Sequence, residues 1–265
     1  MWVKANSLRQ RMVSGWYNGG FPEIQGEGMK PSHIRAIFFD AGNTLLYPRL
    51  DERARDLTAA GFPARVEDFH AAERAAKQKL DVWLWPQIRK GEVPRTIDHY
   101  YWAQYLMSLL GLIGAPETEH ARLIGVVADG FRNIRTWSVV MPETPGYLAS
   151  LKEQGYFLGV ISNSIGTIED QLQHVGLRDY FQAVFDSAIV GVEKPHPEIF
   201  QLALGSAQVA ANEAVFVGDT NATDVGGAQL AGLHGVLIDR IGAYPHAECP
   251  RITSLPELDS VLAAW

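Results

Sequence analysis

Residues 34–45 read Ile-Arg-Ala-Ile-Phe-Phe-Asp-Ala-Gly-Asn-Thr-Leu. After Arg35 the run is apolar up to Phe39, and it ends abruptly in Asp40 and a turn-forming Ala-Gly-Asn sequence. A short apolar run that is bounded in this way is typical of a buried strand. We therefore predict a strand over 34–39, with Asp40 at its carboxyl end.

Strands and helices alternate again after Pro142. The pattern predicts strands over 156–161, 183–185, 214–217 and 235–238, and helices over 144–154, 165–175, 197–205 and 224–231. Such alternation implies right-handed crossovers between parallel strands. The predicted fold class is therefore α/β, with a Rossmann-like parallel sheet as its core.

The region that follows the first strand is helical instead. Helix-forming residues dominate 66–84, and apolar residues recur at helical spacing over 97–112. We expect prolines to divide the region into roughly four helices; they are Pro63, Pro86, Pro94 and Pro116. We interpret 49–137 as an inserted helical cap, 31–48 and 138–265 as the core, and 1–30 as an N-terminal extension outside the core.

Composition limits the classes of partner. The chain has 265 residues, of which 23 are basic and 30 acidic, and its net charge is −7. This balance argues against nucleic acid or an anionic membrane as the main partner. The single cysteine, Cys249, excludes an internal disulfide and fits a cytoplasmic location. No apolar run approaches the ~20 residues that span a bilayer. The oligomeric state is not indicated.

Polar residues follow the predicted strands. Ligands of open parallel sheets bind outside the carboxyl ends of the strands. Four loops are candidates, and they contain Asp40, Ser162-Asn163, Lys194, and Asp219 with Asp224. Phosphoryl transfer requires a nucleophile, a cation for the phosphate oxygens and a metal held by oxygen ligands. These loops supply that set.

Each loop is assigned a role on this basis. Asp40 is the candidate nucleophile, and Mg²⁺ would be held by Asp40, the carbonyl of Gly42 and Asp219, with Asp224 acting at the outer shell. Lys194 would offset the negative charge of carboxylates and phosphate, and it is both a catalytic and a substrate-binding candidate. Ser162 and Asn163 are the further candidates for binding the substrate.

These motifs, in this order, resemble the haloacid dehalogenase-like hydrolase superfamily. The matching segments are 38–45, 160–163, 194–200 and 217–228. The resemblance covers the chain from about Ile34 to the end, and the helical insertion is similar to the family's C1-type cap. It implies an aspartate nucleophile, Mg²⁺, and most often phosphatase activity on a small phosphorylated metabolite.

The chain departs from the family pattern at Gly42. The usual phosphatases have a second aspartate there, which protonates the leaving oxygen and contributes ~10² to 10⁴-fold as a general acid and base. We therefore expect slow turnover of ordinary phosphate monoesters. A substrate with a good leaving group, such as an acyl or aryl phosphate, would need little protonation, and a cap residue such as His99 or His120, or an ordered water, would be a substitute acid.

Three alternatives stay open at this point. Family members that resemble 2-haloacid dehalogenases lack the second acid and need no metal, although the pair Asp219 and Asp224 is more typical of a cation site. Phosphonate-cleaving members use a cap lysine, and Lys77, Lys79 and Lys90 are available, although the sequence marks none of them as activated. A weakly catalytic regulatory or binding protein is also consistent with the fold. An aromatic cluster in the cap is expected to form mainly its core, with one or two members setting substrate choice. Its members are Trp83, Trp85, Tyr100, Tyr101, Trp102 and Tyr105.

Overall fold

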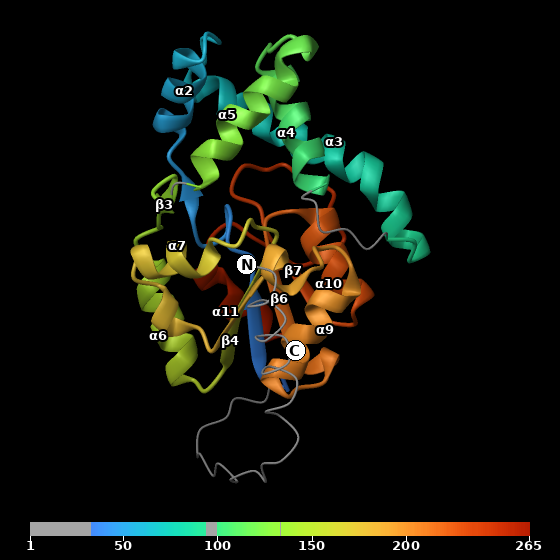
Figure 1. Ribbon diagram of the computed structural model, residues 1–265. Helices are drawn as coiled ribbons and strands as arrows, with labels where there is room; N and C mark the ends of the chain where they lie inside the picture. Colours follow the sequence, from blue (N-terminus) through green and yellow to red (C-terminus); the bar gives the residue numbers. More distant parts are fainter. Residues whose placement is uncertain (1–32, 94–99, 133) are drawn as a thin grey trace.

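The computed structural model describes residues 33–93, 100–132 and 134–265 (Figure 1). In this part of the chain, six parallel strands form one sheet in the order β5-β4-β1-β6-β7-β8. The strands are β1 (Ala36–Phe39), β4 (Phe157–Ser162), β5 (Ala183–Asp186), β6 (Ala214–Gly218), β7 (His234–Ile238) and β8 (Arg251–Ile252). The predicted α/β fold class is confirmed.

Helices cover both faces of this sheet. Side chains alternate along β1, so Ile37 and Phe39 point to one face while Ala36 and Phe38 point to the other, and all four are fully buried. The first face packs against α6 (Thr144–Glu153), α7 (Ile168–His174) and α11 (Leu258–Leu262). The second packs against α9 (Pro197–Ala207) and α10 (Gly227–Leu230). The short helix α8 (Ser187–Val190) follows β5.

A second group of helices lies beyond the carboxyl edge of the sheet (Figure 1). They are α2 (Leu50–Ala59), α3 (Val66–Lys90), α4 (Tyr100–Leu112) and α5 (His120–Arg132), and they bury an apolar cluster of their own. Short antiparallel strands, β2 (Tyr47–Pro48) and β3 (Trp137–Val139), pair at the junction with the core. We call these four helices the cap and keep 49–137 as its proposed extent.

Pro86 does not divide the cap as predicted. It lies inside α3, which continues to Lys90 and ends at Gly91 in a left-handed conformation. Although an internal proline removes one backbone hydrogen bond, Leu84 and Ile88 on either side of it are buried. Tertiary packing therefore outweighs the local penalty, which sequence spacing alone does not show.

Some predictions fall outside the described residues, namely those on the extension 1–30, on Pro94 and on His99. Among the described ones, the helix predicted over 224–231 is a π-helical segment, η4 (Asn221–Gly226), followed by α10. No helix in the described ranges is long and apolar enough to cross a membrane.

Candidate active site

The order in which strands are added to the sheet reverses at β1, and this places three strand ends together. From β1 the chain proceeds through β4 to β5 on one side, and β6 lies on the other side. Asp40 follows β1, Ser162 ends β4, and Gly218 ends β6 directly before Asp219. Ligands of open α/β sheets bind at such a reversal. The predicted site residues therefore meet at one edge of the sheet.

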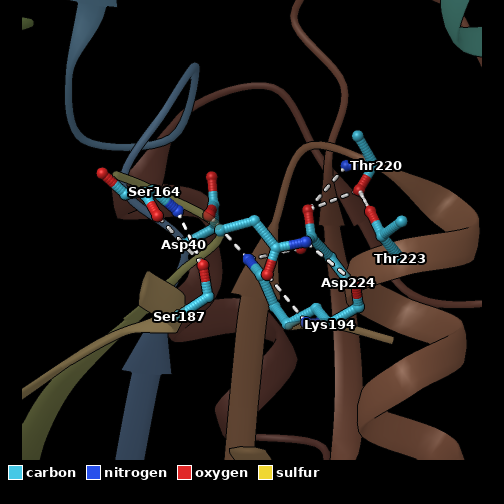
Figure 2. A network of polar contacts seen from close by, with 8 residues as sticks. Asp40, Ser164, Ser187, Lys194, Thr220, Thr223 and Asp224 are labelled. Atoms are coloured by element: carbon cyan, nitrogen blue, oxygen red, sulfur yellow. Dashed lines mark hydrogen bonds and ion pairs between the residues drawn. The ribbon is translucent and has the colours of Figure 1, made fainter. Parts of the chain in front are cut away.

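Lys194 links Asp40 to Asp224 (Figure 2). Its Nζ lies 2.6 Å from Asp40 Oδ1 and 2.7 Å from Asp224 Oδ1, and its side chain is only 2% exposed. Burial lowers the pKa of Lys194, but the two carboxylates outweigh burial and raise it overall. Lys194 is therefore a positive charge between the two carboxylates, and its role in offsetting the charge of a phosphate stays a prediction.

Asn163 holds the Lys194 loop in place. Its Nδ2 donates to the carbonyl of Lys194 at 2.8 Å, and its Oδ1 accepts from the Lys194 amide at 2.7 Å. The nitrogen and the oxygen of the Asn163 side chain thus both bind the backbone of Lys194. These contacts position Lys194, and Asn163 also lines the cavity described below. Its role in substrate binding stays a prediction.

The loop after β4 is fixed by residues that the sequence analysis missed. Ser187 Oγ accepts from the Ser164 amide at 3.0 Å and donates to the Ser164 carbonyl at 3.1 Å (Figure 2). Asp186 accepts from the amides of Gly166 and Ile168. A carboxylate from the end of β5 therefore accepts the backbone amide at which α7 begins.

Asp224 is held by the turn before η4. Its Oδ2 accepts from the Thr220 amide at 2.9 Å and from Thr220 Oγ1 at 2.7 Å (Figure 2). It packs so closely on Gly218 that a Cβ there would lie 2.5 Å from the Asp224 Cβ and Cγ. Glycine at position 218 therefore allows the carboxylate to reach Lys194.

Three carboxylates converge where a metal was predicted. One oxygen each of Asp40, Asp219 and Asp224 lies within 4.8 Å of the others. The span across an octahedral Mg²⁺ site is about 4.2 Å, twice its bond length, and the donors are the hard oxygens that this cation prefers. The residues therefore fit Mg²⁺. Burial, opposed by Lys194 and supported by the two other carboxylates, raises the pKa of Asp40 to about 8.

The cap adds a charged residue that the sequence did not single out. Lys77, on α3, places Nζ 2.7 Å from Asp219 Oδ2 and 3.3 Å from Glu73 Oε1, and its side chain is 6% exposed. Burial lowers the pKa of Lys77, but Asp219 and Glu73 outweigh burial and raise it. A lysine four residues after a glutamate is typical of a solvated helix pair, so no local pattern distinguishes Lys77 from other surface lysines.

Gly42 faces an indole ring. A Cβ at position 42 would lie 3.3 Å from Cη2 and Cζ3 of Trp137, the first residue of β3. The Arg53 guanidinium lies 5.0 Å from the centroid of the same ring. The space next to the backbone of Gly42, where an aspartate side chain would begin, is therefore bordered by Trp137.

A cavity of about 350 Å³ lies between the cap and the edge of the sheet. Its floor includes Asp40, Ser162 and Lys194, and its walls are mostly apolar. Among the cap aromatics, Tyr101 and Tyr105 line it, whereas the side chains of Tyr100 and Trp102 lie outside the described part. His120 hydrogen-bonds the carbonyl of Ala115 within the cap.

The fold and the site together define a capped α/β hydrolase. Residues 34–232 match the model of the haloacid dehalogenase-like hydrolase family, and the chain belongs to this family. It is an enzyme of that hydrolase class.

Relatives and solved structures agree with this assignment. The chain is 32% identical over 246 residues to a glyceraldehyde 3-phosphate phosphatase of Pyrococcus furiosus, with 86% of this chain and 93% of the relative covered. It is 35% identical to a phosphoserine phosphatase of Thermus thermophilus over 128 residues, about half of each chain (48% and 49%). The structure of a 2-haloacid dehalogenase from Pseudomonas syringae superposes with a TM-score of 0.53 at 26% identity, covering 88% of this chain and 99% of that one.

Proposed function

We propose that the protein is a Mg²⁺-dependent phosphatase of a small organic phosphate, with Asp40 as the nucleophile. The observation that carries the proposal is the position of Lys194, which pairs with Asp40 and Asp224 beside a third carboxylate. Halide displacement from a carbon atom needs no divalent metal, whereas a phosphate dianion beside three carboxylates requires additional positive charge around its oxygens. The phosphatase relatives support the same class of reaction.

The proposed reaction has two steps. An oxygen of Asp40 attacks phosphorus, the bond between phosphorus and the leaving oxygen breaks, and that oxygen departs with the electron pair. Water then attacks the phosphorus of the aspartyl phosphate, and the bond between phosphorus and the Asp40 oxygen breaks. Asp40 is restored as a carboxylate, one proton of the water stays on the inorganic phosphate, and the other passes to solvent or to the released leaving group. Lys194 neutralises charge on Asp40 and on the phosphoryl oxygens in both steps.

Bound Mg²⁺ would supply charge neutralisation for the phosphate and would favour the ionised form of Asp40. Asp40 and Asp219 are proposed as its carboxylate ligands, with the Gly42 carbonyl as a third ligand. Because Asp224 is held by Lys194 and Thr220, we keep it in the outer shell.

The leaving group is proposed to be a good one, such as a phenolate. Position 42 carries no acid, and the ring of Trp137 borders its backbone. The mostly apolar cavity walls, which include Tyr101 and Tyr105, suit an aryl group better than a sugar. A phenol has a pKa near about 10, so its anion departs with little need of a proton.

The test is release of 4-nitrophenol from 4-nitrophenyl phosphate by the wild type, with Mg²⁺ and with a chelator. Asp40→Asn should lose at least about 10³-fold in kcat/KM, and Asp51→Asn, an exposed aspartate on α2, is the matched control that keeps activity. Turnover that survives chelation or the loss of Asp40 would refute the proposal. Chloride release from a 2-chloro acid without metal would assign the chain to the dehalogenases instead.

A further inference from the structure

Lys77 reaches the proposed metal site from the cap, not from the core. Its Nζ is 2.7 Å from Asp219 Oδ2, and the contact is buried on both sides, at 6% and 8% side-chain exposure. Asp219 is the proposed metal ligand that directly follows β6. An ammonium group therefore pairs with one oxygen of a carboxylate that the metal also needs.

The position of Lys77 is set by the docking of α3 on the core. Asp81, one helical turn beyond Lys77, accepts from Asn221 Nδ2 at 2.8 Å and from the Ala222 amide at 2.9 Å. Gln78 Nε2 donates to the carbonyl of Ala243 at 2.8 Å. These contacts occupy the same side of α3 as Lys77, so its ammonium group stays beside Asp219 as long as the cap is docked.

The packing farther along α3 leads to the same conclusion. A Cβ at Gly226 would lie 2.8 Å from Trp85 Cζ3 and 2.9 Å from Ile88 Cδ1. The end of η4 is thus in close contact with α3, and Leu84 and Ile88 form a buried cluster with Ala222. Lys77 therefore stays next to Asp219 only while α3 remains packed on η4.

We propose that Lys77 is a cap-borne cation that competes with the divalent metal for Asp219, so that cap docking and metal binding oppose each other. The inference rests on the metal site of the proposed function. With the cap docked, two ammonium groups already face the three carboxylates, and Glu73 shares the ammonium group of Lys77. A divalent cation added alone would bind beside the ammonium group of Lys77 and repel it. The charge of a phosphate dianion would offset that repulsion.

The competition has a reciprocal consequence. Because the metal repels Lys77, metal binding must weaken the docking of α3 by the same factor by which docking weakens metal binding. A phosphate group accepts hydrogen bonds from an ammonium ion, so substrate would give Lys77 a partner in place of Asp219. Lys77 would then act as a positioning residue that favours binding of metal and phosphate together over metal alone.

The test is calorimetric titration with Mg²⁺ alone. Lys77→Met, and Lys77→Gln as a second variant whose amide can still donate to Asp219, should each bind Mg²⁺ at least tenfold more tightly than the wild type. Lys79→Met removes the same charge from an exposed position on the same helix, and it should bind as the wild type does. In the wild type, Mg²⁺ should also speed amide exchange in α3.

The outcomes separate the two proposals. If the wild type binds Mg²⁺ and both Lys77 variants bind it equally or more weakly, the competition is refuted while the metal site stands. If no protein in the set binds Mg²⁺, the metal site itself is wrong and the inference fails with it. If Lys79→Met gains as much affinity for Mg²⁺ as Lys77→Met, the gain comes from the general loss of positive charge and not from the contact with Asp219, and the competition is refuted.

Discussion

Restoring an aspartate at position 42 tests why the chain carries glycine there. The Cβ of Gly42→Asp would lie 3.3 Å from Cη2 and Cζ3 of Trp137, and the carboxylate atoms need further room. Such overpacking costs about 1–3 kcal/mol of folding free energy. The acid itself is worth ~10² to 10⁴-fold, or about 3–5 kcal/mol of activation free energy. The two free energies belong to different processes, so the folding cost does not cancel the catalytic gain. The gain is lost only if the ring of Trp137 keeps the new carboxylate away from the leaving oxygen.

We predict that Gly42→Asp alone changes kcat/KM for an alkyl phosphate by no more than about threefold, because Trp137 prevents the acid from taking its place. When Trp137→Ala makes room, the same substitution should raise alkyl phosphate turnover at least about 100-fold over Trp137→Ala alone. For 4-nitrophenyl phosphate the gain should be below about tenfold, since its leaving group needs little protonation.

The assay is a double-mutant cycle on both substrates, with phosphate release followed for ethyl phosphate and nitrophenol release for the aryl ester. An equal gain in the single and the double variant would refute the argument that Trp137 is the obstacle. An equal gain on both substrates would show that the missing acid does not limit the choice of leaving group.

Three other predictions concern the structure around the site. Lys194→Met leaves Asp40 and Asp224 without their shared buried cation and should lower the free energy of unfolding by about 3–5 kcal/mol in urea titrations; an unchanged midpoint would contradict the pairing. Gly218→Ala should cost about 1–3 kcal/mol because its Cβ would overlap Asp224, whereas Gly205→Ala, in an open position on α9, should stabilise by up to about 1 kcal/mol. Burial raises the pKa of Cys249 to about 11. The rate of alkylation of the folded protein should therefore still rise about tenfold per pH unit near pH 9, whereas in urea the rate should level off near the ordinary thiol pKa of about 8.5. The same pH profile in the folded and the unfolded protein would contradict this prediction.

The core of the fold could be predicted because its signals are local. The apolar run before Asp40 and the alternating strands after Pro142 describe buried parallel strands, and the structure confirms the α/β class. The meeting of Asp40, Lys194, Asp219 and Asp224 follows from the same signals, because parallel strands end at one edge of the sheet. Their proposed roles remain predictions.

The contribution of the cap could not be predicted in this way. Lys77 was one of several cap lysines in the sequence, and only the docking of α3 on η4 brings it to Asp219. Trp137 is placed next to Gly42 by the pairing of β2 with β3. These strands have two and three residues, and they are too short to show the two-residue hydrophobic periodicity that predicts a strand. Pro86 was predicted to end a helix because its local cost is visible in the sequence, whereas the packing that offsets it is not.

The most direct test of the account is to identify the atom that carries the phosphoryl group. Wild-type protein would be mixed with an aryl phosphate and Mg²⁺, quenched in acid within one turnover, and mapped by peptide mass spectrometry. If Asp40 is the nucleophile, the added mass of one phosphoryl group will be found on Asp40, and it will be absent in Asp40→Asn and absent when a chelator replaces Mg²⁺. Turnover with the group on another residue, or with no labelled residue at all, would contradict nucleophilic attack by Asp40.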